Sequence, residues 1–382
     1  PTDALVQEFS ARFQRVTGTP AGWSVSENLL RAAQIADALG AYDIEYIQDP
    51  DTGIASILGN PTYVDRVLFP RDTLRYRRGD CDDTTALLAS LLESVSIPTA
   101  IMTSPDHVFL AFDTGEPEQN LWLFRSETTT AFAHRGTVWV PVETTILQQG
   151  FTAAWEEASR LVLRHSNNDA DRVTASTARD LEFLPMSEEW RTYPQLPIGQ
   201  ASFTVYPPTG EAVGALRSES VSALRETLYE SNIAALERAL RDQSERRRLG
   251  TLNQIGILHA RFGETGDAES SFQRAIRLNP DHVASYLNLA NLAIARNDPR
   301  AALRLLDEAE ERRPAGVVAT LLRAQAEYLA GNREEAAEYM TMLAERAPEL
   351  AAQFPHLAGG ATGGRASEAQ ANPVLPWSVE EE

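Results

Sequence analysis

The chain has 382 residues and a formal net charge of −20 at pH 7, from 54 acidic and 34 basic side chains. A protein this acidic repels the phosphates of nucleic acids and anionic lipid headgroups, so neither is expected as a partner. Hydrophobic residues make up 43%, which is typical of globular proteins and excludes a wholly disordered chain, and no apolar run of about 18 residues predicts a membrane-spanning helix.

Residues 1–165 have the pattern of an α+β domain. Apolar residues at three- and four-residue spacing predict helices over 4–16 and 27–39, and the polar stretch 50–61 is expected to be a loop. A helix beginning at Cys81 carries one buried stripe, formed by Leu88, Leu91, Leu92 and Val95. Alternating polar and apolar residues then predict strands at 99–103, 107–113, 120–126 and 137–142. A closing helix is predicted at 151–165. A helix followed by a short antiparallel sheet is typical of the α+β class.

Residues 166–214 are rich in asparagine, aspartate, proline, serine and threonine and lack a clear period, apart from a stretch at 201–206 that fits a strand. We expect a connector between two domains here. Two interpretations remain open for it, namely a solvated linker and an extension that folds back over the first domain.

Residues 215–352 are predicted to be helical and repetitive. Two sets of residues recur at intervals of 34: Pro280, Pro314 and Pro348, and Ala268, Ala302 and Ala336. This period is typical of tetratricopeptide (TPR) repeats, in which small residues let two helices approach and proline ends the second one. The chain therefore resembles that family over three repeats, at 249–282, 283–316 and 317–350, the last with Arg323 in a position for a large apolar residue. The tail 353–382 is dominated by small and polar residues and is expected to be disordered.

The chemistry of the first domain centres on Cys81, the single cysteine of a chain that contains no lysine. One cysteine excludes an internal disulfide and a cysteine-based zinc cluster. Cys81 stands at an expected helix start, where N–H groups and the helix dipole stabilise a thiolate or an oxyanion. His107 opens a later strand and Glu143 ends another, so a base that activates sulfur and a carboxylate that fixes the base are both present.

Three motifs in this order resemble the transglutaminase-like cysteine enzyme superfamily: Gly-Asp-Cys-Asp-Asp at 79–83, Asp-His-Val-Phe at 106–109 and Trp-Val-Pro-Val-Glu-Thr at 139–144. The resemblance covers about residues 60–150 and implies a papain/transglutaminase-like fold, with the cysteine heading a helix that packs on an antiparallel sheet. It implies that Cys81 is the nucleophile and His107 the general base and acid. Glu143 would orient the histidine, with Asp113 as the alternative carboxylate.

Three aspartates flank the cysteine: Asp80, Asp82 and Asp83. Their charges oppose a thiolate, so a neutralising partner is expected, either a calcium ion or nearby arginines, namely Arg75, Arg77 and Arg78. The motif also resembles bacterial, periplasmic transglutaminase-like cysteine proteinases, which include calcium-dependent members, and this makes Asp80 and Asp82 the calcium candidates. Asp82 and Asp83 are expected to support the site, and Asp83 also suits the start of a helix as a negative charge. No cofactor is expected to be required.

The sequence thus predicts a cysteine peptidase or transglutaminase-like acyltransferase that acts on a protein or peptide amide through a thioester, with water or an amine as acceptor. Its TPR repeats are expected to recruit a protein or peptide partner. The alternative is a catalytically inactive transglutaminase-like scaffold that acts in protein–protein interaction. The resemblance and the start at Pro1 without methionine favour an extracytoplasmic, periplasmic location, with the cytoplasm as the alternative.

Overall fold

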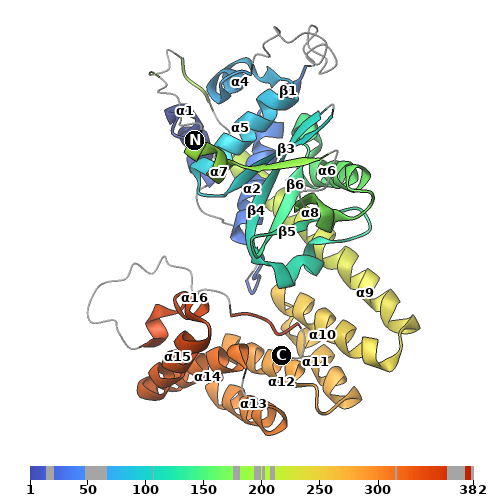
Figure 1. Cartoon of the computed structure of the whole chain (residues 1–382), viewed down its shortest axis with the longest axis vertical. Helices are drawn as coiled ribbons and strands as arrows, with labels where there is room; N and C mark the ends of the chain where they lie inside the picture. Colours follow the sequence, from blue (N-terminus) through green and yellow to red (C-terminus); the bar gives the residue numbers. More distant parts are fainter. Residues whose placement is uncertain are drawn as a thin grey trace. The chain divides into compact units, whose positions relative to one another are not determined.

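The chain divides into two compact units in the computed structural model (Figure 1). Unit 1 comprises Pro1–Thr19 and Val25–Asn232, and unit 2 comprises Pro20–Ser24 and Ile233–Glu382. The structure describes residues 1–13, 21–47, 67–105, 107–174, 181–192, 199, 203–206, 211–314, 316–358 and 375–379. The loop expected at 50–61 lies outside the described residues.

The described strands of unit 1 include five that form one antiparallel sheet (Figure 1). Their order in the sheet is β5–β6–β4–β3–β7, with bounds β3 (Thr99–Ser104), β4 (His107–Pro117), β5 (Phe132–His134), β6 (Thr137–Val142) and β7 (Glu182–Pro185). The strands expected at 99–103, 107–113 and 137–142 are confirmed. The sheet joins segments far apart in sequence, because β7 pairs with β3 and β4 lies between β3 and β6.

Helices cover the sheet of unit 1 and bury both sides of its central strand. The helices here are α1 (Ala4–Ser10), α2 (Glu27–Ala41), α4 (Pro70–Tyr76), α5 (Cys81–Ser94) and α6 (Phe151–His165), and a 3₁₀ turn η1 (Ala11–Phe13) follows α1. All four residues 109–112 of β4 are buried, so the strand is covered on both faces. Phe109 and Ala111 pack with residues of α6, and α5 packs against β3 and β4. The stripe predicted on α5 is buried throughout, at Leu88, Leu91 and Leu92 and at Val95 just beyond the helix.

The strand expected at 120–126 is wrong. Residues Glu118–Phe124 form the 3₁₀ helix η2 instead. Leu123 and Phe124 are neighbours, and both are buried. In a strand with one covered face, neighbouring side chains point to opposite faces, so only one of the two would be buried. Asn120 also donates a hydrogen bond from Nδ2 to Glu116 Oε2 at 2.7 Å, which holds the turn after β4.

Part of the expected connector belongs to the sheet. Strand β7 pairs with β3 from Thr103 opposite Glu182 to Ala100 opposite Pro185. Phe183 packs edge-on against Phe132, with ring centroids 5.4 Å apart. The chain therefore returns over the first domain at these residues, as the second of the two interpretations expects. Helix α7 (Met186–Thr192) follows β7, and residues 203–206 of the stretch that fits a strand are not in one.

Unit 2 contains the helical repeats that the sequence predicts (Figure 1). Its helices pack as pairs: α10 (Glu245–Arg261) with α11 (Thr265–Leu278), α12 (Val283–Ala295) with α13 (Pro299–Arg312), and α14 (Val317–Ala330) with α15 (Arg333–Arg346). At the start of the region expected to be helical from residue 215, the structure has α8 (Glu211–Leu224) and the π-helical η5 (Arg225–Glu230) in unit 1, followed by α9 (Ser231–Asp242), which continues into unit 2. Arg323 stands in a position for a large apolar residue, and its guanidinium group is hydrogen-bonded there. It donates to Asp307 Oδ1 at 2.8 Å and to Glu310 Oε1 at 3.0 Å.

The tail expected to be disordered from residue 353 onward is partly ordered. After α16 (Pro348–Ala351) and η6 (Pro355–Ala358), Phe354 and Leu357 are buried with Leu321 and Met340 against the third helix pair. Residues 375–379 are also described, and Trp377 is 8% exposed. Because most residues of the tail are small or polar, its composition does not indicate the few apolar residues that anchor it.

Candidate functional site

Cys81 is the first residue of α5, and side chains on both sides of it fix the start of this helix. Asp80 Oδ1 accepts the backbone N–H of Asp83 at 3.2 Å, and Asp83 Oδ2 accepts the backbone N–H of Asp80 at 3.4 Å. This capping box satisfies N–H groups that the first turn of a helix leaves without intrahelical partners. Asp83 Oδ1 also accepts the backbone N–H of Leu68 at 2.6 Å. The thiol therefore sits partly exposed on a firmly held helix terminus.

His107 and Glu143 come from adjacent strands of the sheet. His107 is the first residue of β4, and Glu143 directly follows β6, which pairs with β4 so that Leu110 faces Val142. The register brings the two side chains together, with His107 Nε2 2.6 Å from Glu143 Oε2. The side chain of Glu143 is 3% exposed and that of His107 is 22% exposed, so the carboxylate is the buried member of the pair.

The thiol completes this chain of polar groups, because the side chain of Cys81 hydrogen-bonds to that of His107. The bonds to Cys81 and Glu143 raise the pKa of His107 to about 10, against the effect of burial. Burial favours the neutral form of Glu143, but the bond and charge of His107, with bonds from Thr145, lower the pKa of this carboxyl. The ring is therefore protonated at neutral pH, with the thiol as its neighbour.

Two threonines that the sequence did not single out hold these groups in place. Thr145 donates to Glu143 Oε1 from its backbone N–H at 3.0 Å and from its hydroxyl at 2.6 Å. The buried hydroxyl of Thr144 bonds to those of Thr84 at 3.0 Å and Thr85 at 2.9 Å. The helix of the cysteine and the segment of the carboxylate are thereby joined directly. The sequence signal is that Thr144 ends the motif at 139–144 and that Thr145 comes directly after it.

Tyr46 is a second neighbour of the site that the sequence did not reveal. It lies in β1 (Glu45–Tyr46), which pairs in parallel with β2 (Arg78–Gly79), so that Tyr46 is opposite Gly79. Burial raises the pKa of Tyr46, and the negative charges of Cys81, Asp80 and Glu143 raise it further. The phenol therefore lies in the electrostatic field of the thiol and the carboxylate. Strands of two residues have no periodicity by which this pairing could be predicted.

The alternative carboxylate, Asp113, is not brought to the histidine. It lies six residues further along β4, and at 3.3 Å per residue this separates the two by about 20 Å. Its Oδ1 accepts the backbone N–H of Gly115 at 2.8 Å, and burial raises the pKa of its carboxyl. The structure therefore places Glu143, and not Asp113, beside His107.

The acidic residues around Cys81 do not make a complete calcium site among the described residues. Oxygens of Asp80, Asp82 and Asp83 lie within 4.8 Å of one another. However, Asp83 uses both carboxylate oxygens on backbone N–H groups, and Asp82 Oδ1 accepts the N–H of Asp83 at 2.8 Å. Calcium takes about six to eight oxygen ligands, more than this cluster offers. The aspartates act as helix caps here, and calcium binding by Asp80 and Asp82 stays a prediction.

The arginines expected to neutralise these aspartates lie against aromatic rings. The guanidinium carbon of Arg75 is 4.6 Å from the ring centroid of Phe203, and that of Arg77 is 4.4 Å from the ring centroid of Tyr42. These are cation–π distances. Among the described residues, Asp80, Asp82 and Asp83 accept hydrogen bonds from backbone N–H groups at the start of α5.

Replacing Asp83 with alanine is expected to lower the free energy of unfolding by about 2 kcal/mol, because the capping box is lost and the N–H groups of Leu68 and Asp80 lose their acceptor. Asp83 is 6% exposed, so water does not readily replace it. Asp82→Ala is the control, since it removes the same charge and leaves the box intact. Urea denaturation of both variants measures the difference, and equal losses would contradict the capping role.

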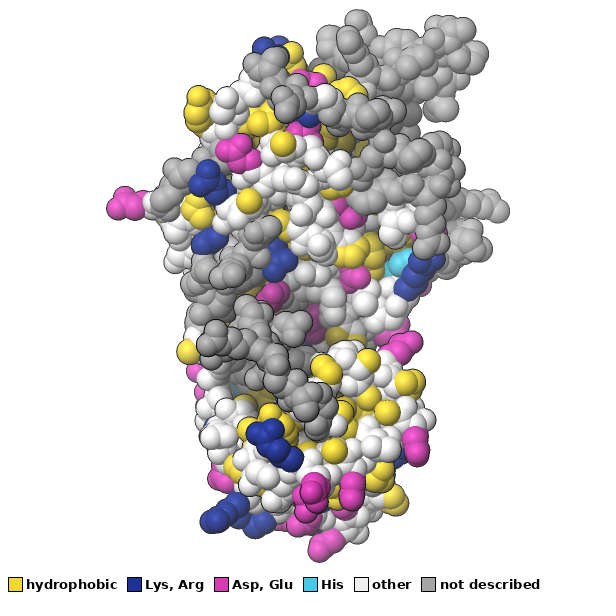
Figure 2. Space-filling view, turned by 90° about the vertical axis from the view of Figure 1, so that its left-hand side faces the viewer, with side chains coloured by type: hydrophobic (Ala, Val, Ile, Leu, Met, Phe, Trp, Pro, Cys, Tyr) yellow, Lys and Arg dark blue, Asp and Glu magenta, His cyan; other side chains and the backbone are white. Residues whose placement is uncertain are grey.

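The surface of the described residues is mixed in charge. On the face drawn in Figure 2, arginine side chains are interspersed with acidic ones and do not gather into one basic patch among the residues that the structure describes. None of the described helices is long and apolar enough to cross a bilayer.

Comparison with known proteins finds one family. No curated protein matches the chain at a significant level. Residues 260–322 match the family model described as tetratricopeptide repeat, from the end of α10 into α14. Repeats of this kind stack into extended binding surfaces. Residues 260–322 are thus identified as TPR repeats, which indicates that unit 2 binds a protein partner.

Proposed function

We propose that unit 1 is the catalytic unit of a cysteine-dependent acyl-transfer enzyme of the transglutaminase-like type. The observation that carries the proposal is the hydrogen-bonded series Cys81–His107–Glu143, in which the thiol begins a helix, the imidazole begins a strand and the carboxylate is buried. The motifs around these residues resemble that superfamily, in which the same three groups act together. TPR repeats in the same chain then present a protein substrate or partner.

The reaction follows from the positions of the three groups. The thiolate of Cys81 attacks an amide carbonyl carbon, and N–H groups at the start of α5 stabilise the developing oxyanion. As the C–N bond breaks, the His107 imidazolium gives its proton to the leaving amine, which leaves a thioester on sulfur. Water or an amine then attacks the thioester and gives a proton to His107. The C–S bond breaks, so the thiolate and imidazolium return and a carboxylic acid or a new amide is released.

The remaining residues act as positioning groups in this proposal. Glu143 holds the ring of His107, Thr145 holds the Glu143 carboxylate, and Thr144 links the strand end to the helix of the nucleophile. The reaction requires no cofactor, because the nucleophile, base and oxyanion donors all belong to the chain.

The direct test is a covalent acyl adduct on Cys81. The full chain is incubated with a mixture of N-acetylated tetrapeptides and quenched in acid, and intact-protein mass spectrometry detects the adduct. Wild type is expected to carry hydroxylamine-sensitive acyl groups, and Cys81→Ala none. Methylamine added before the quench separates the two acceptors: methylamide products indicate amine transfer, and free acids indicate hydrolysis.

The outcome also decides the alternative function. A wild-type chain that forms no adduct, together with a Cys81→Ala variant that keeps every activity of wild type, would favour a non-catalytic scaffold. The TPR repeats support partner binding in either case.

A further inference from the structure

The chain's own residues 375–379 lie against the first helices of two successive helix pairs. Asn288 of α12 donates from Nδ2 to the Ser378 carbonyl at 2.9 Å and accepts the Ser378 N–H on Oδ1 at 2.8 Å. Asn253 of α10 donates to the Ser378 carbonyl at 2.7 Å, and Asn291 donates to the Pro376 carbonyl at 3.2 Å. Three asparagine side chains thus bind backbone groups of a non-helical segment.

Apolar contacts add selectivity to these backbone bonds. The indole of Trp377 stacks on Phe272 of α11, with ring centroids 6.3 Å apart and an interplanar angle of 19°. Leu375 packs against the buried clusters of the second and third helix pairs. The segment is therefore bound in the way that a peptide ligand is bound. Asparagine side chains hydrogen-bond to its backbone, and an aromatic ring stacks on its tryptophan.

The three asparagines are buried with the segment in place, and their burial supports a peptide-binding role for this surface. Asn253 is 0% exposed, Asn288 is 1% exposed and Asn291 is 4% exposed. Buried amides are costly unless their hydrogen bonds are satisfied. Here residues 375–379 satisfy them, together with one bond from Asn288 Nδ2 to Asn253 Oδ1 at 2.8 Å. An array that needed only to pack would place apolar side chains at these positions.

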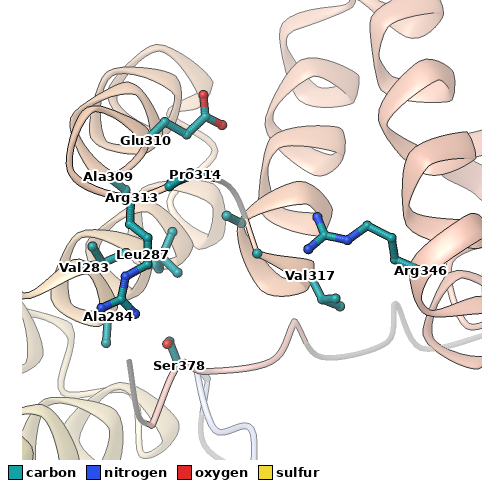
Figure 3. A pocket seen from close by; sticks show the side chains of 12 residues that line it. Val283, Ala284, Leu287, Ala309, Glu310, Arg313, Pro314, Val317, Arg346 and Ser378 are labelled. Atoms are coloured by element: carbon teal, nitrogen blue, oxygen red, sulfur yellow. The ribbon is translucent and has the colours of Figure 1, made fainter. Parts of the chain in front are cut away.

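The segment does not fill the space beside it. A cavity of about 290 Å³ adjoins Ser378 and is lined by Val283, Leu287 and Val317 together with Arg313 and Arg346 (Figure 3). In the view of Figure 3, Ser378 lies at the edge of this space, with the side chains of Leu287 and Arg313 above it. A ligand with a side chain larger than serine at this position would gain contacts that the tail does not make.

We propose that this surface of unit 2 binds a non-helical segment of a partner protein that carries a proline–tryptophan pair, and that residues 375–379 are an internal competitor for the same surface. The tail shows the chemistry of the partner segment, since it occupies the site through backbone bonds and a stacked indole. The tail competes at an effective concentration on the order of millimolar, because it is part of the same chain. This proposal does not rest on Cys81, and a Cys81→Ala variant is expected to bind the same segment unchanged.

The test uses the full chain and a fluorescein-labelled peptide with the sequence of residues 371–382, followed by fluorescence anisotropy. Wild type is expected to bind the peptide weakly, because its own tail competes. Trp377→Ala weakens binding of the tail and is expected to lower the apparent Kd about 30-fold, the factor by which a competitor at about 1 mM with a Kd of about 30 μM raises it. Adding Asn288→Ala removes two bonds to Ser378 and is expected to raise that Kd at least 10-fold. A peptide with alanine in place of tryptophan is the matched control and is expected not to bind.

Two results would overturn the proposal: equal affinity of wild type and Trp377→Ala for the peptide, or no effect of Asn288→Ala. A measurement on wild type alone tests the proposal even when the variants fail to fold. At millimolar unlabelled peptide, the Ser378 amide, which donates to Asn288, is expected to exchange its hydrogen faster while α10–α15 stay protected. Unchanged exchange of residues 375–379 would mean that they are a permanent part of the fold.

Discussion

Replacing His107 with alanine is expected to slow the alkylation of Cys81 by iodoacetamide about 100-fold at pH 6, where an ordinary thiol with a pKa near 8.5 is less than 1% thiolate. The thiolate is the reacting form, and in the wild-type chain the hydrogen-bonded imidazolium stabilises it. Mass spectrometry of the adduct on the chain's single cysteine gives the rate directly. No substrate is needed, so the result is independent of what the enzyme acts on.

The pH dependence provides the control. The pKa of His107 is raised to about 10, so the ring stays protonated between pH 6 and pH 9, and the wild-type rate is expected to change less with pH than that of His107→Ala. In His107→Ala the rate should instead rise about 10-fold per pH unit below the pKa of an ordinary thiol. Parallel profiles for the two proteins would contradict the role given to His107.

The same raised pKa predicts how stability depends on pH. In the unfolded chain the pKa of His107 returns to about 6.5. The folded state therefore binds the proton more tightly, and this contribution to stability is complete below pH 6.5 and is lost as pH rises toward 10. The free energy of unfolding of wild type relative to His107→Gln is expected to fall over this range. Urea denaturation at pH 6 and pH 9.5 measures this difference in the free energy of unfolding. A difference that grows with pH would contradict the raised pKa of His107.

Replacing Gly256 with alanine is expected to destabilise unit 2 by about 2 kcal/mol through overpacking. A Cβ at this position would lie 2.4 Å from Phe272 Cε1 and 2.6 Å from Cδ1, and Phe272 is fully buried. The ring must then shift, which also disturbs the surface on which Trp377 stacks. The variant should accordingly lose affinity for the labelled peptide as well as stability.

Gly250 offers a matched control on the same helix. A Cβ there meets no atom within 4 Å, so Gly250→Ala is expected to stabilise the array by up to about 1 kcal/mol through helix propensity alone. The two substitutions are chemically identical and differ only in what the new methyl group meets. Thermal unfolding of both variants tests this, and shifts in the same direction would contradict the packing at Gly256.

Much of the fold is predictable because it depends on periodic patterns. The 34-residue interval identified the repeats of unit 2, and the stripe at Leu88, Leu91 and Leu92 identified the buried face of α5. Cys81, His107 and Glu143 were found from their order and from the elements that carry them. The structure brings these three together, and their catalytic role is our proposal.

What the sequence did not reveal are contacts between short segments far apart in the chain. Tyr46 reaches the site through a two-residue parallel pairing, and β7 joins the sheet across 79 positions, from Thr103 to Glu182 at its near end. Trp377 is one aromatic residue in a tail of small and polar ones. Such segments are too short to show a period, and their partners are chosen by tertiary packing rather than by local preference.

The place of the asparagine-bound segment in the chain has a consequence during protein synthesis. Residues 375–379 follow α10–α15 in sequence, so the ribosome makes them after the helices that hold them. Because domains fold from their N-terminal side as they emerge, a nascent array exposes Asn253 and Asn288 to water before any intramolecular rival exists. A partner present at that moment binds without competition, whereas one that arrives later must first displace the tail. The timing of expression of the two proteins would then set how fast the complex forms.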